Sequence, residues 1–333
     1  MRIGLALPHY DFSSPDGAPV TWERLAAAAR RAEDLGFDSV WVSDHFFLSL
    51  ARYGGPDRPY GAAEPLTTLA ALATVTERIR LGSLVVSTGF RHPATLAKSA
   101  TTIDLLSGGR LDLGLGAGWY EDEYRAFGYR FGTPGERFEI LEETLEVLHR
   151  LFGQGPASYQ GTHFRLDEAY NRPSPAQQPR PPLWVGGKGG PRLRRLMARL
   201  ADGWNTVWAW TPEDYGERAR ALRRACQEAG RVMIRQSLGL YALVGEDQAD
   251  LAARWKAWQA WAPGGVLDGV SLEEWGRDKL VGTPEQVLER LAAFAAHGVE
   301  ETIVGAAPLP FAVADDAMLD LVAEAVIPAA RDL

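Results

Sequence analysis

The stretch IRLGSLVVSTGFRHPATLAKSATTIDLLSGGRLDLGL, residues Ile79–Leu115, decides the fold. Its ends, Ile79–Ser87 and Leu111–Leu115, are short apolar runs that predict buried strands. The segment between them, Pro93–Leu106, predicts a helix. A strand, a helix and another strand in this order are typical of a parallel sheet.

The same alternation runs along the whole chain. Eight strands are predicted, at 2–7, 39–43, 79–87, 111–115, 183–185, 203–207, 234–244 and 301–304, and helices separate them. This pattern favours a single (β/α)8 barrel domain over 1–333 rather than a doubly wound sheet. We expect two insertions: a hairpin segment at 153–182, turning near Gln160-Gly161, and a helical segment near 247–280. Thr211-Pro212 and Thr283-Pro284 predict capped helix starts.

Composition narrows the class of protein. The 333 residues are 46% hydrophobic, carry a formal net charge of −8 and include one cysteine, Cys226. No basic block is long enough to follow a nucleic-acid backbone, and the run Arg192–Arg199 predicts a solvated helix face. Pro8 and His9 come too early for a signal peptide, and no apolar run reaches the ~18 residues of a membrane span. We therefore expect a cytoplasmic protein without nucleic-acid or membrane partners.

In a barrel of this kind the active site lies at the carboxyl ends of the strands. The residues that follow the predicted strands are polar, glycine-rich or aromatic: Pro8, His9, Asp44, His45, Ser87, Thr88, Gly116, Gly118, Trp119, Gly186–Gly190, Asn205, Thr206 and Trp208. Such a set suits a flat, phosphorylated cofactor lying across the mouth of the barrel.

Two glycine-rich segments could contact that cofactor. Gly186-Gly187-Lys188-Gly189-Gly190 stands between a strand and a helix, where backbone N–H groups can bind an anion and Lys188 adds a charge. It is not a Walker A motif, and a purely geometric turn is the alternative. The segment LGLGAGW has Trp119 where the Rossmann motif needs a third glycine. Gly116 and Gly118 therefore predict close approach to a ring or substrate, with tight barrel packing as the alternative.

The remaining motifs indicate neither a metal site nor a hydrolase. The histidines lack metal-binding spacing, so no metal is expected, and no G-x-S-x-G elbow indicates a hydrolase. The stripe Trp255, Trp258 and Trp261 favours packing or a subunit contact over a substrate lid.

Four segments together resemble the bacterial-luciferase-like oxidoreductase superfamily: LGFDSVWVSDHF, ERIRLGSLVVSTGFRHPATLAKSATTIDLLSGGRLDLGLGAGWYEDEY, PPLWVGGKGGPRLRRLMARLADGWN and VGTPEQVLERLAAFAAHGVEETIV. They occur in the family's order and span nearly the whole chain. The segment VSDHF is similar to that of the branch that uses the deazaflavin coenzyme F420, and in particular to its glucose-6-phosphate dehydrogenases.

The resemblance implies a role for each matching residue. Asp44 and His45 would lie at the ring, His45 beside the position of hydride transfer, and Leu84-Val85 would be a cis peptide behind the ring. Gly116, Ala117, Gly118 and Trp119 would line the pocket, while Gly186, Gly187, Lys188, Gly189 and Gly190 would hold the phosphate. A homodimer is also implied. Trp119 stands where the sugar-phosphate enzymes have a carboxylate, and their tryptophan after the second strand is missing, which favours a small, more apolar substrate.

These inferences lead to three hypotheses. The first is an F420-dependent oxidoreductase in which His45 gives or takes a proton, since imidazole titrates near neutrality. The second is an FMN-dependent monooxygenase supplied by a separate flavin reductase. The third is a non-catalytic flavin-binding protein. A structural role, in which Asp44 only orients a buried His45, is the alternative for that pair.

Overall fold

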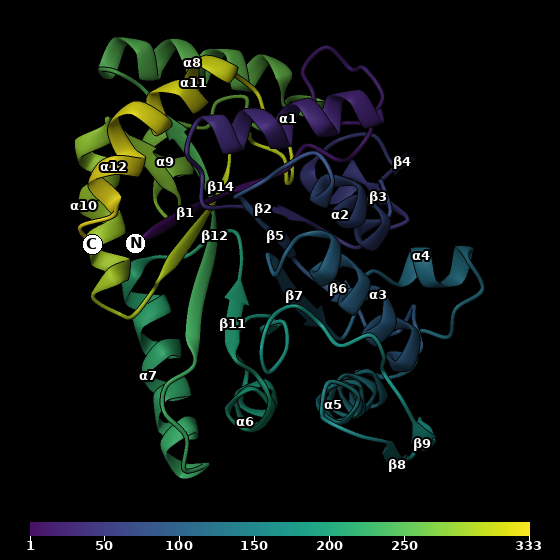
Figure 1. Cartoon of the computed structure of the whole chain (residues 1–333). Coiled ribbons are helices and arrows are strands. Elements are labelled where there is room, and N and C mark those ends of the chain that lie inside the picture. Colours follow the sequence, from purple (N-terminus) through teal and green to yellow (C-terminus); the bar gives the residue numbers. More distant parts are fainter.

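The computed structural model describes all 333 residues and contains the predicted closed barrel (Figure 1). Eight parallel strands form it: β1 (Arg2–Ala6), β2 (Ser39–Val42), β5 (Arg80–Ser83), β7 (Leu111–Gly116), β10 (Leu183–Gly186), β11 (Gly203–Thr206), β12 (Arg235–Val244) and β14 (Glu301–Gly305). They pair in the order β10-β11-β12-β14-β1-β2-β5-β7, and β7 pairs with β10 to close the ring. The prediction of a (β/α)8 fold is confirmed.

Helices surround the strands (Figure 1). They are α1 (Trp22–Asp34), α2 (Pro65–Ala73), α3 (Pro93–Leu106), α5 (Pro134–Leu151), α6 (Pro191–Leu200), α7 (Pro212–Glu228), α10 (Pro284–Ala295) and, after β14, α11 (Asp316–Leu321), a π-helical turn (Val322–Val326) and α12 (Ile327–Ala330). The predicted capped starts are confirmed: the Thr211 hydroxyl accepts from the Asp214 N–H at 3.1 Å, and the Gln286 side chain accepts from the Thr283 N–H at 3.0 Å.

The third predicted strand differs from expectation. It is broken after Ser83, and its last two residues form a separate strand, β6 (Val86–Ser87), that pairs with β7. The residues between the two pieces are Leu84 and Val85, and the peptide bond that joins them is cis, as the family resemblance implies. A second non-prolyl cis bond, Val207–Trp208, was not predicted.

Four short elements were also missed. They are the antiparallel pair β3 (Phe47–Ser49) and β4 (Pro59–Gly61), the helix α4 (Glu121–Ala126) and the strand β13 (Leu280–Gly282), which pairs with β12. Strands of three residues are too short to show periodicity, and α4 has no side-chain cap at Tyr120 to mark its start.

Both predicted insertions are present. The first contains the antiparallel hairpin β8 (Ala157–Gln160) and β9 (Arg165–Ala169), and the second contains α8 (Gln248–Trp261) and α9 (Leu272–Gly276). Trp255 and Trp258 are 6% and 2% exposed and pack against Trp275, with ring centroids 5.3 and 5.4 Å away. These two tryptophans therefore stabilise the core of the insertion rather than covering a substrate.

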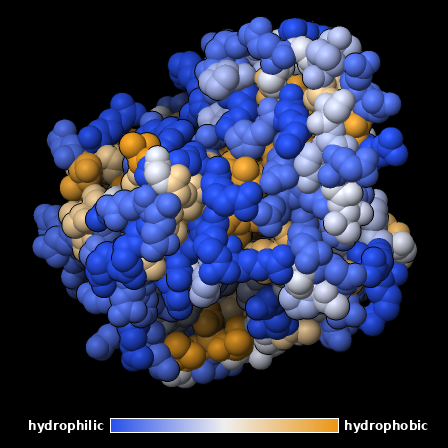
Figure 2. Space-filling view, turned by 90° about the horizontal axis from the view of Figure 1, so that it is seen from below, coloured by the Kyte–Doolittle hydropathy of each residue, from blue (hydrophilic) through white to orange (hydrophobic).

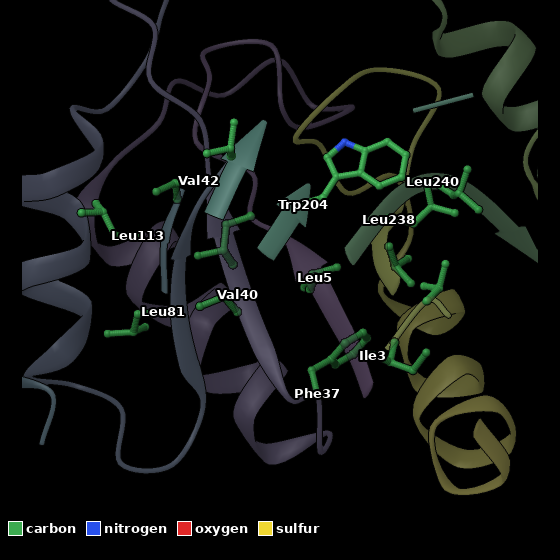
Figure 3. Close-up of a cluster of buried hydrophobic side chains, with 14 of the residues drawn as sticks. Ile3, Leu5, Phe37, Val40, Val42, Leu81, Leu113, Trp204, Leu238 and Leu240 are labelled. Carbon is green, nitrogen blue, oxygen red and sulfur yellow. The ribbon is translucent and has the colours of Figure 1, made fainter. Parts of the chain in front are cut away.

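Figure 3 shows part of the main core, between the strands and the helices, where side chains such as Leu5, Val40, Leu81 and Leu238 point outward from the barrel. Strand residues alternate, so the neighbouring positions point inward.

The interior of the barrel is filled by two tryptophans, Trp41 and Trp184, which meet edge to face at 6.3 Å. Glycines make room for them: a Cβ on Gly82 would lie 2.2 Å from Trp41, and one on Gly203 would lie 2.1 Å from Trp184.

Ion pairs close the amino-terminal end of the barrel. Arg2 bonds to Glu301 at 3.0 Å, and Arg80 bonds to Asp112 at 2.6 Å. Asp112 also accepts from the Trp184 indole at 2.9 Å, so the polar groups beneath the tryptophans are paired. The carboxyl-terminal end of the barrel is therefore the end that can hold a ligand.

Two further properties of the fold concern membranes and metals. None of the helices combines the length and apolar composition needed to cross a bilayer. No three His, Cys, Asp or Glu side chains come together as a group that could hold a metal ion.

Candidate active site

A cavity of about 580 Å³ opens at the carboxyl ends of β2, β5, β7, β10 and β11. All predicted site residues except Gly189 line it: Asp44, His45, Leu84, Val85, Gly116, Ala117, Gly118, Trp119, Gly186, Gly187, Lys188 and Gly190. Segments far apart in the sequence therefore meet where the barrel model expects them. Gly189 is buried beside the Trp204 ring instead.

Val85 forms the floor of the cavity. Its side chain lies between Gly116 and Gly186, where an added Cβ would come within 2.6 and 2.8 Å of its Cγ2 atom. Any larger residue at either glycine would displace Val85 toward the cavity. Gly118 has φ +76° and lies against Tyr124, whose hydroxyl would be 2.0 Å from an added Cβ. Close packing at the top of the barrel, one of the two alternatives for Gly116 and Gly118, therefore explains why both positions are glycine.

His45 is held by a carboxylate that the sequence did not reveal. Its Nδ1 atom lies 2.8 Å from Oε1 of Glu123, on α4, and the other carboxylate oxygen accepts from the Phe46 N–H at 2.9 Å. The Glu123 side chain is 2% exposed and that of His45 is 12% exposed. A carboxylate accepts at Nδ1, so this nitrogen carries the proton, and Nε2 has no hydrogen-bond partner within the protein.

Asp44 has different partners. Both of its carboxylate oxygens accept from Arg91, and one also accepts from the Ser87 N–H at 2.8 Å. Arg91 in turn donates to Glu64 at 2.6 Å. Burial alone would lower the pKa of Arg91, but the two carboxylates raise it above its ordinary value. The idea that Asp44 orients His45 is therefore wrong: Asp44 joins neighbouring loops, and Glu123 holds the imidazole.

A second histidine lies under the cavity. His9 is fully buried, and its Nδ1 donates to the Leu7 carbonyl oxygen at 2.9 Å while its Nε2 lies 3.0 Å from the Ser43 hydroxyl. Tyr10 bonds to the same hydroxyl at 2.5 Å. Burial lowers the pKa of His9 to about 4. Ser43 lines the cavity, so this neutral network supports its floor.

The far end of the cavity has the features of an anion site. It is formed by the glycine loop after β10 and the first residues of α6. Gly190, the N-cap of α6, has no side chain to accept from the helix, and Pro191 has no N–H. The N–H groups of Arg192 and Leu193 therefore have no intrahelical acceptor, and the helix dipole adds to their attraction for an anion.

Cations surround these donors. Arg137 from α5, Arg192 from α6 and Lys188 all line the cavity. The Lys188 ammonium lies 4.5 Å from the centre of the Trp210 ring, and burial lowers its pKa. Two buried polar atoms of lining residues have no partner, Nε of Arg137 and Oδ1 of Asn205. Unpaired buried atoms are costly, so they too indicate a polar ligand.

The residues present therefore fit a cofactor with a planar ring and a phosphate. Leu84, Val85 and the glycines offer a smooth apolar face, and the loop at 186–190 with α6 offers backbone donors and positive charge.

The mouth of the cavity is aromatic. Trp119 is 47% exposed, and its ring lies edge-on to His45 with centroids 5.5 Å apart. The Tyr120 ring packs beside the Trp119 ring, with centroids 5.2 Å apart. The Arg52 guanidinium lies 4.6 Å from the centre of the Trp119 ring. A substrate that reaches His45 would contact Trp119.

Asn205 lines the cavity as its place after a predicted strand indicated, but sequence reasoning missed several other lining residues, chiefly Ser43, Glu123, Arg137, Phe138 and Arg192. Arg192 was interpreted as part of a solvated helix face, and no pattern marks Glu123. The nearest signal is the acidic run Glu121–Glu123, which directly follows Tyr120.

Known proteins resemble this chain in sequence and in fold. Residues 1–301 match the family described as luciferase-like monooxygenase. An uncharacterized protein of Mycobacterium tuberculosis is 35% identical over 242 residues, which cover 69% of this chain and 82% of that protein. The F420-dependent hydroxymycolic acid dehydrogenase of M. tuberculosis is 30% identical over 316 residues, 93% of this chain and 81% of that enzyme.

Solved structures share the fold. An F420-dependent secondary alcohol dehydrogenase, in complex with an F420-acetone adduct, superposes with a TM-score of 0.78 at 22% identity, covering 99% of both chains. The long-chain alkane monooxygenase LadA superposes with a TM-score of 0.79 at 16% identity, covering 99% of this chain and 90% of LadA. With a family match over residues 1–301, the chain belongs to the luciferase-like monooxygenase family.

Proposed function

We propose that this protein is an F420-dependent oxidoreductase that interconverts a small apolar secondary alcohol and its ketone. The observation that carries the proposal is one cavity with an imidazole, oriented by a buried carboxylate, at one end and unpaired anion donors at the other. Relatives named as F420-dependent dehydrogenases support the cofactor. A relative named as a ketoreductase, 34% identical over 209 residues, supports the substrate class.

The chain's own residues would hold the coenzyme at two places. Val85 and the glycines on either side of it would face the ring, and the N–H groups at the start of α6, with Arg137 and Arg192, would hold the phosphate. When bound, the deazaflavin supplies a carbon that accepts or gives a hydride. None of these coenzyme-binding residues has to gain or lose a proton during turnover.

His45 would carry the proton. Oxidation of an alcohol to a ketone releases a hydride from the carbon and a proton from the hydroxyl, and reduction returns both. Nε2 of His45 can accept that proton because Nδ1 already donates to Glu123, and the resulting imidazolium would be stabilised by the carboxylate. The fixed contact of Glu123 with the Phe46 N–H keeps the carboxylate, and through it the ring, in one orientation.

Trp119 would favour an apolar substrate. Its exposed ring stands beside His45 and, with Tyr120, presents an apolar surface there, although the Arg52 guanidinium lies over the same ring. The substrate itself and a homodimeric state stay predictions.

A second function, an FMN-dependent monooxygenase, is favoured by the description of the family and by the fold shared with LadA. The same floor and anion site would serve FMN, because both cofactors have a planar ring and a phosphate. The two hypotheses differ in what the reduced cofactor does with oxygen.

Equilibrium titration separates them. Purified protein is titrated with F420 and with FMN, following F420 fluorescence and flavin absorbance, and then assayed with a panel of secondary alcohols. We expect micromolar or tighter binding of F420 and alcohol-dependent loss of its 420-nm absorbance. Tight binding of FMN alone, with oxygen consumption after reduction, would instead establish the monooxygenase.

A further inference from the structure

A groove lined by four arginines lies between α6 and α7, outside the cavity. Arg194 comes from α6, and Arg218, Arg220 and Arg224 come from α7, with Ala221 and one carboxylate, Glu217, completing the lining. Figure 2 views the molecule from below Figure 1, the side on which α6 and the lower part of α7 lie, and that face is largely hydrophilic. Arg218, Arg220 and Arg224 are exposed, so the groove is open to a charged ligand.

The four guanidinium groups have no carboxylate partner. None of them takes part in a salt bridge, and the one hydrogen bond among them joins Arg194 to the Gly189 carbonyl oxygen at 2.7 Å. Arg220 and Arg224 are one helical turn apart, a spacing at which like charges repel. Another arginine of α6, Arg199, bonds instead to Glu142 at 2.6 Å.

This local excess of positive charge contrasts with the chain as a whole. The segment 188–235 has eleven basic and five acidic residues, while the whole chain has a net charge of −8. Unpaired like charges held together on an acidic protein create a local field that attracts anions.

The groove adjoins the anion site of the cavity. Arg194 lines the groove and donates to Gly189, and the neighbouring residues of that loop, Lys188 and Gly190, line the cavity. A chain that leaves a phosphate at the start of α6 and runs over the outer face of this helix would meet Arg194 first and then the arginines of α7.

We propose that this groove binds the oligoglutamyl tail of the deazaflavin coenzyme. The tail is a flexible chain of carboxylates attached beyond the phosphate, so its chemistry and its point of attachment both match the groove. Carboxylates pair well with guanidinium groups, and several weak exposed pairs act together when they are on one chain. The inference rests on the proposed use of F420. It assigns a surface that F420 would contact and FMN would not, because FMN ends at its phosphate.

The test compares two forms of the coenzyme and two matched double variants. The forms are F420 with five or more glutamates and the form that ends at the phospholactyl group. Arg220→Gln/Arg224→Gln removes two charges from the groove. Arg195→Gln/Arg223→Gln removes two charges from exposed positions on the same helices that do not line it.

We expect the wild-type protein to bind the long-tailed form more tightly and the groove variant to lose about tenfold in affinity for that form alone, since two partly exposed ion pairs are removed. The control variant should bind both forms as the wild type does, and added salt should reduce the preference for the long tail. Equal affinity of the wild type for both forms, or equal losses in the two double variants, would overturn the proposal while leaving the use of F420 intact. Binding of neither form would instead refute the proposed function.

Discussion

Nδ1 of His45 lies 2.8 Å from Oε1 of Glu123, and the same carboxylate bonds to the Phe46 N–H at 2.9 Å. The pair joins the end of β2 to α4, so one buried carboxylate fixes both the imidazole and the backbone that carries it. The arrangement suits a ring whose Nε2 exchanges protons, because the buried carboxylate at Nδ1 fixes the tautomer and the orientation of the imidazole.

Glu123→Gln should lower turnover by about 10- to 100-fold and leave coenzyme affinity within about twofold, because the amide can still bond to the ring but cannot stabilise its charged form. The pH dependence of kcat/KM should change as well, since the variant removes a negative charge that lies 2.8 Å from the imidazole. Steady-state kinetics between pH 5 and 9 measure both effects.

The control for this change is Glu121→Gln, on the exposed side of the same helix. It should alter neither turnover nor the pH profile. If Glu123→Gln shifts only the thermal midpoint and leaves the pH profile as it was, the carboxylate is structural.

His45→Asn tests the imidazole itself. Asparagine places an N–H near the position of Nδ1, so Glu123 keeps a donor and is not left buried without a partner. The variant lacks Nε2, however, and should lose about 10²- to 10⁴-fold in turnover while it still folds and binds the coenzyme. Activity, F420 affinity and thermal midpoint are measured on one preparation, and a fully active variant would exclude His45 from proton transfer.

Burial of His9 predicts a pH dependence of stability. Its pKa falls from 6.5 to about 4 on folding, so between these values the unfolded chain binds a proton that the folded protein does not. The stabilisation is complete above pH 6.5 and is lost as the pH falls toward 4. Its loss between pH 7.5 and 4.5 should be roughly 2–3 kcal/mol in the free energy of unfolding.

Urea unfolding of the wild type and of His9→Asn at both pH values isolates this contribution. The difference in stability between the two proteins should narrow at pH 4.5, because the variant has no group to titrate at this position. His163→Asn, on the β8–β9 hairpin, is the control, and its difference from the wild type should not narrow in the same way. A constant difference for His9→Asn would mean that this histidine does not drive the acid sensitivity.

The sequence predicted the barrel well because each strand and its helix carry the signal locally. Seven of the eight strands begin and end within two residues of the predicted positions. The exception is the predicted strand Ile79–Ser87, which is interrupted at a cis peptide bond that hydrophobic periodicity cannot reveal. The family resemblance, rather than the apolar pattern, located that bond at Leu84–Val85.

The site was predicted where residues come soon after a strand, as His45 comes three positions after the end of β2 and Gly187 directly follows β10. Site residues were missed where the side chain reaches the cavity from a helix outside the barrel. Glu123 is 78 positions from His45 along the chain and lies on a short helix without a cap, and Arg137 reaches the cavity from inside α5. Such contacts depend on how loops and outer helices pack over the barrel, which the spacing of residues does not encode.

The start of α6 gives a prediction in which stability and binding change in opposite directions. Gly190 has φ −63°, and an added Cβ would meet nothing within 4 Å, so other residues fit there without strain. In Gly190→Asp the carboxylate can cap the helix by accepting from the free N–H groups of its first turn, which should raise the free energy of unfolding by about 0.5–2 kcal/mol. It also fills the proposed phosphate site with a like charge, so affinity for F420 should fall by at least about tenfold.

Gly190→Ala, which adds a methyl group without an acceptor, is the control for Gly190→Asp. Alanine offers the helix no hydrogen bond and the coenzyme no charge, so affinity should fall much less and stability should gain no cap. Calorimetric unfolding and fluorescence titration of the three proteins give the two quantities. An aspartate variant that is stabilised and still binds F420 as the wild type does would place the phosphate away from α6, because the carboxylate and the phosphate cannot share the same N–H donors.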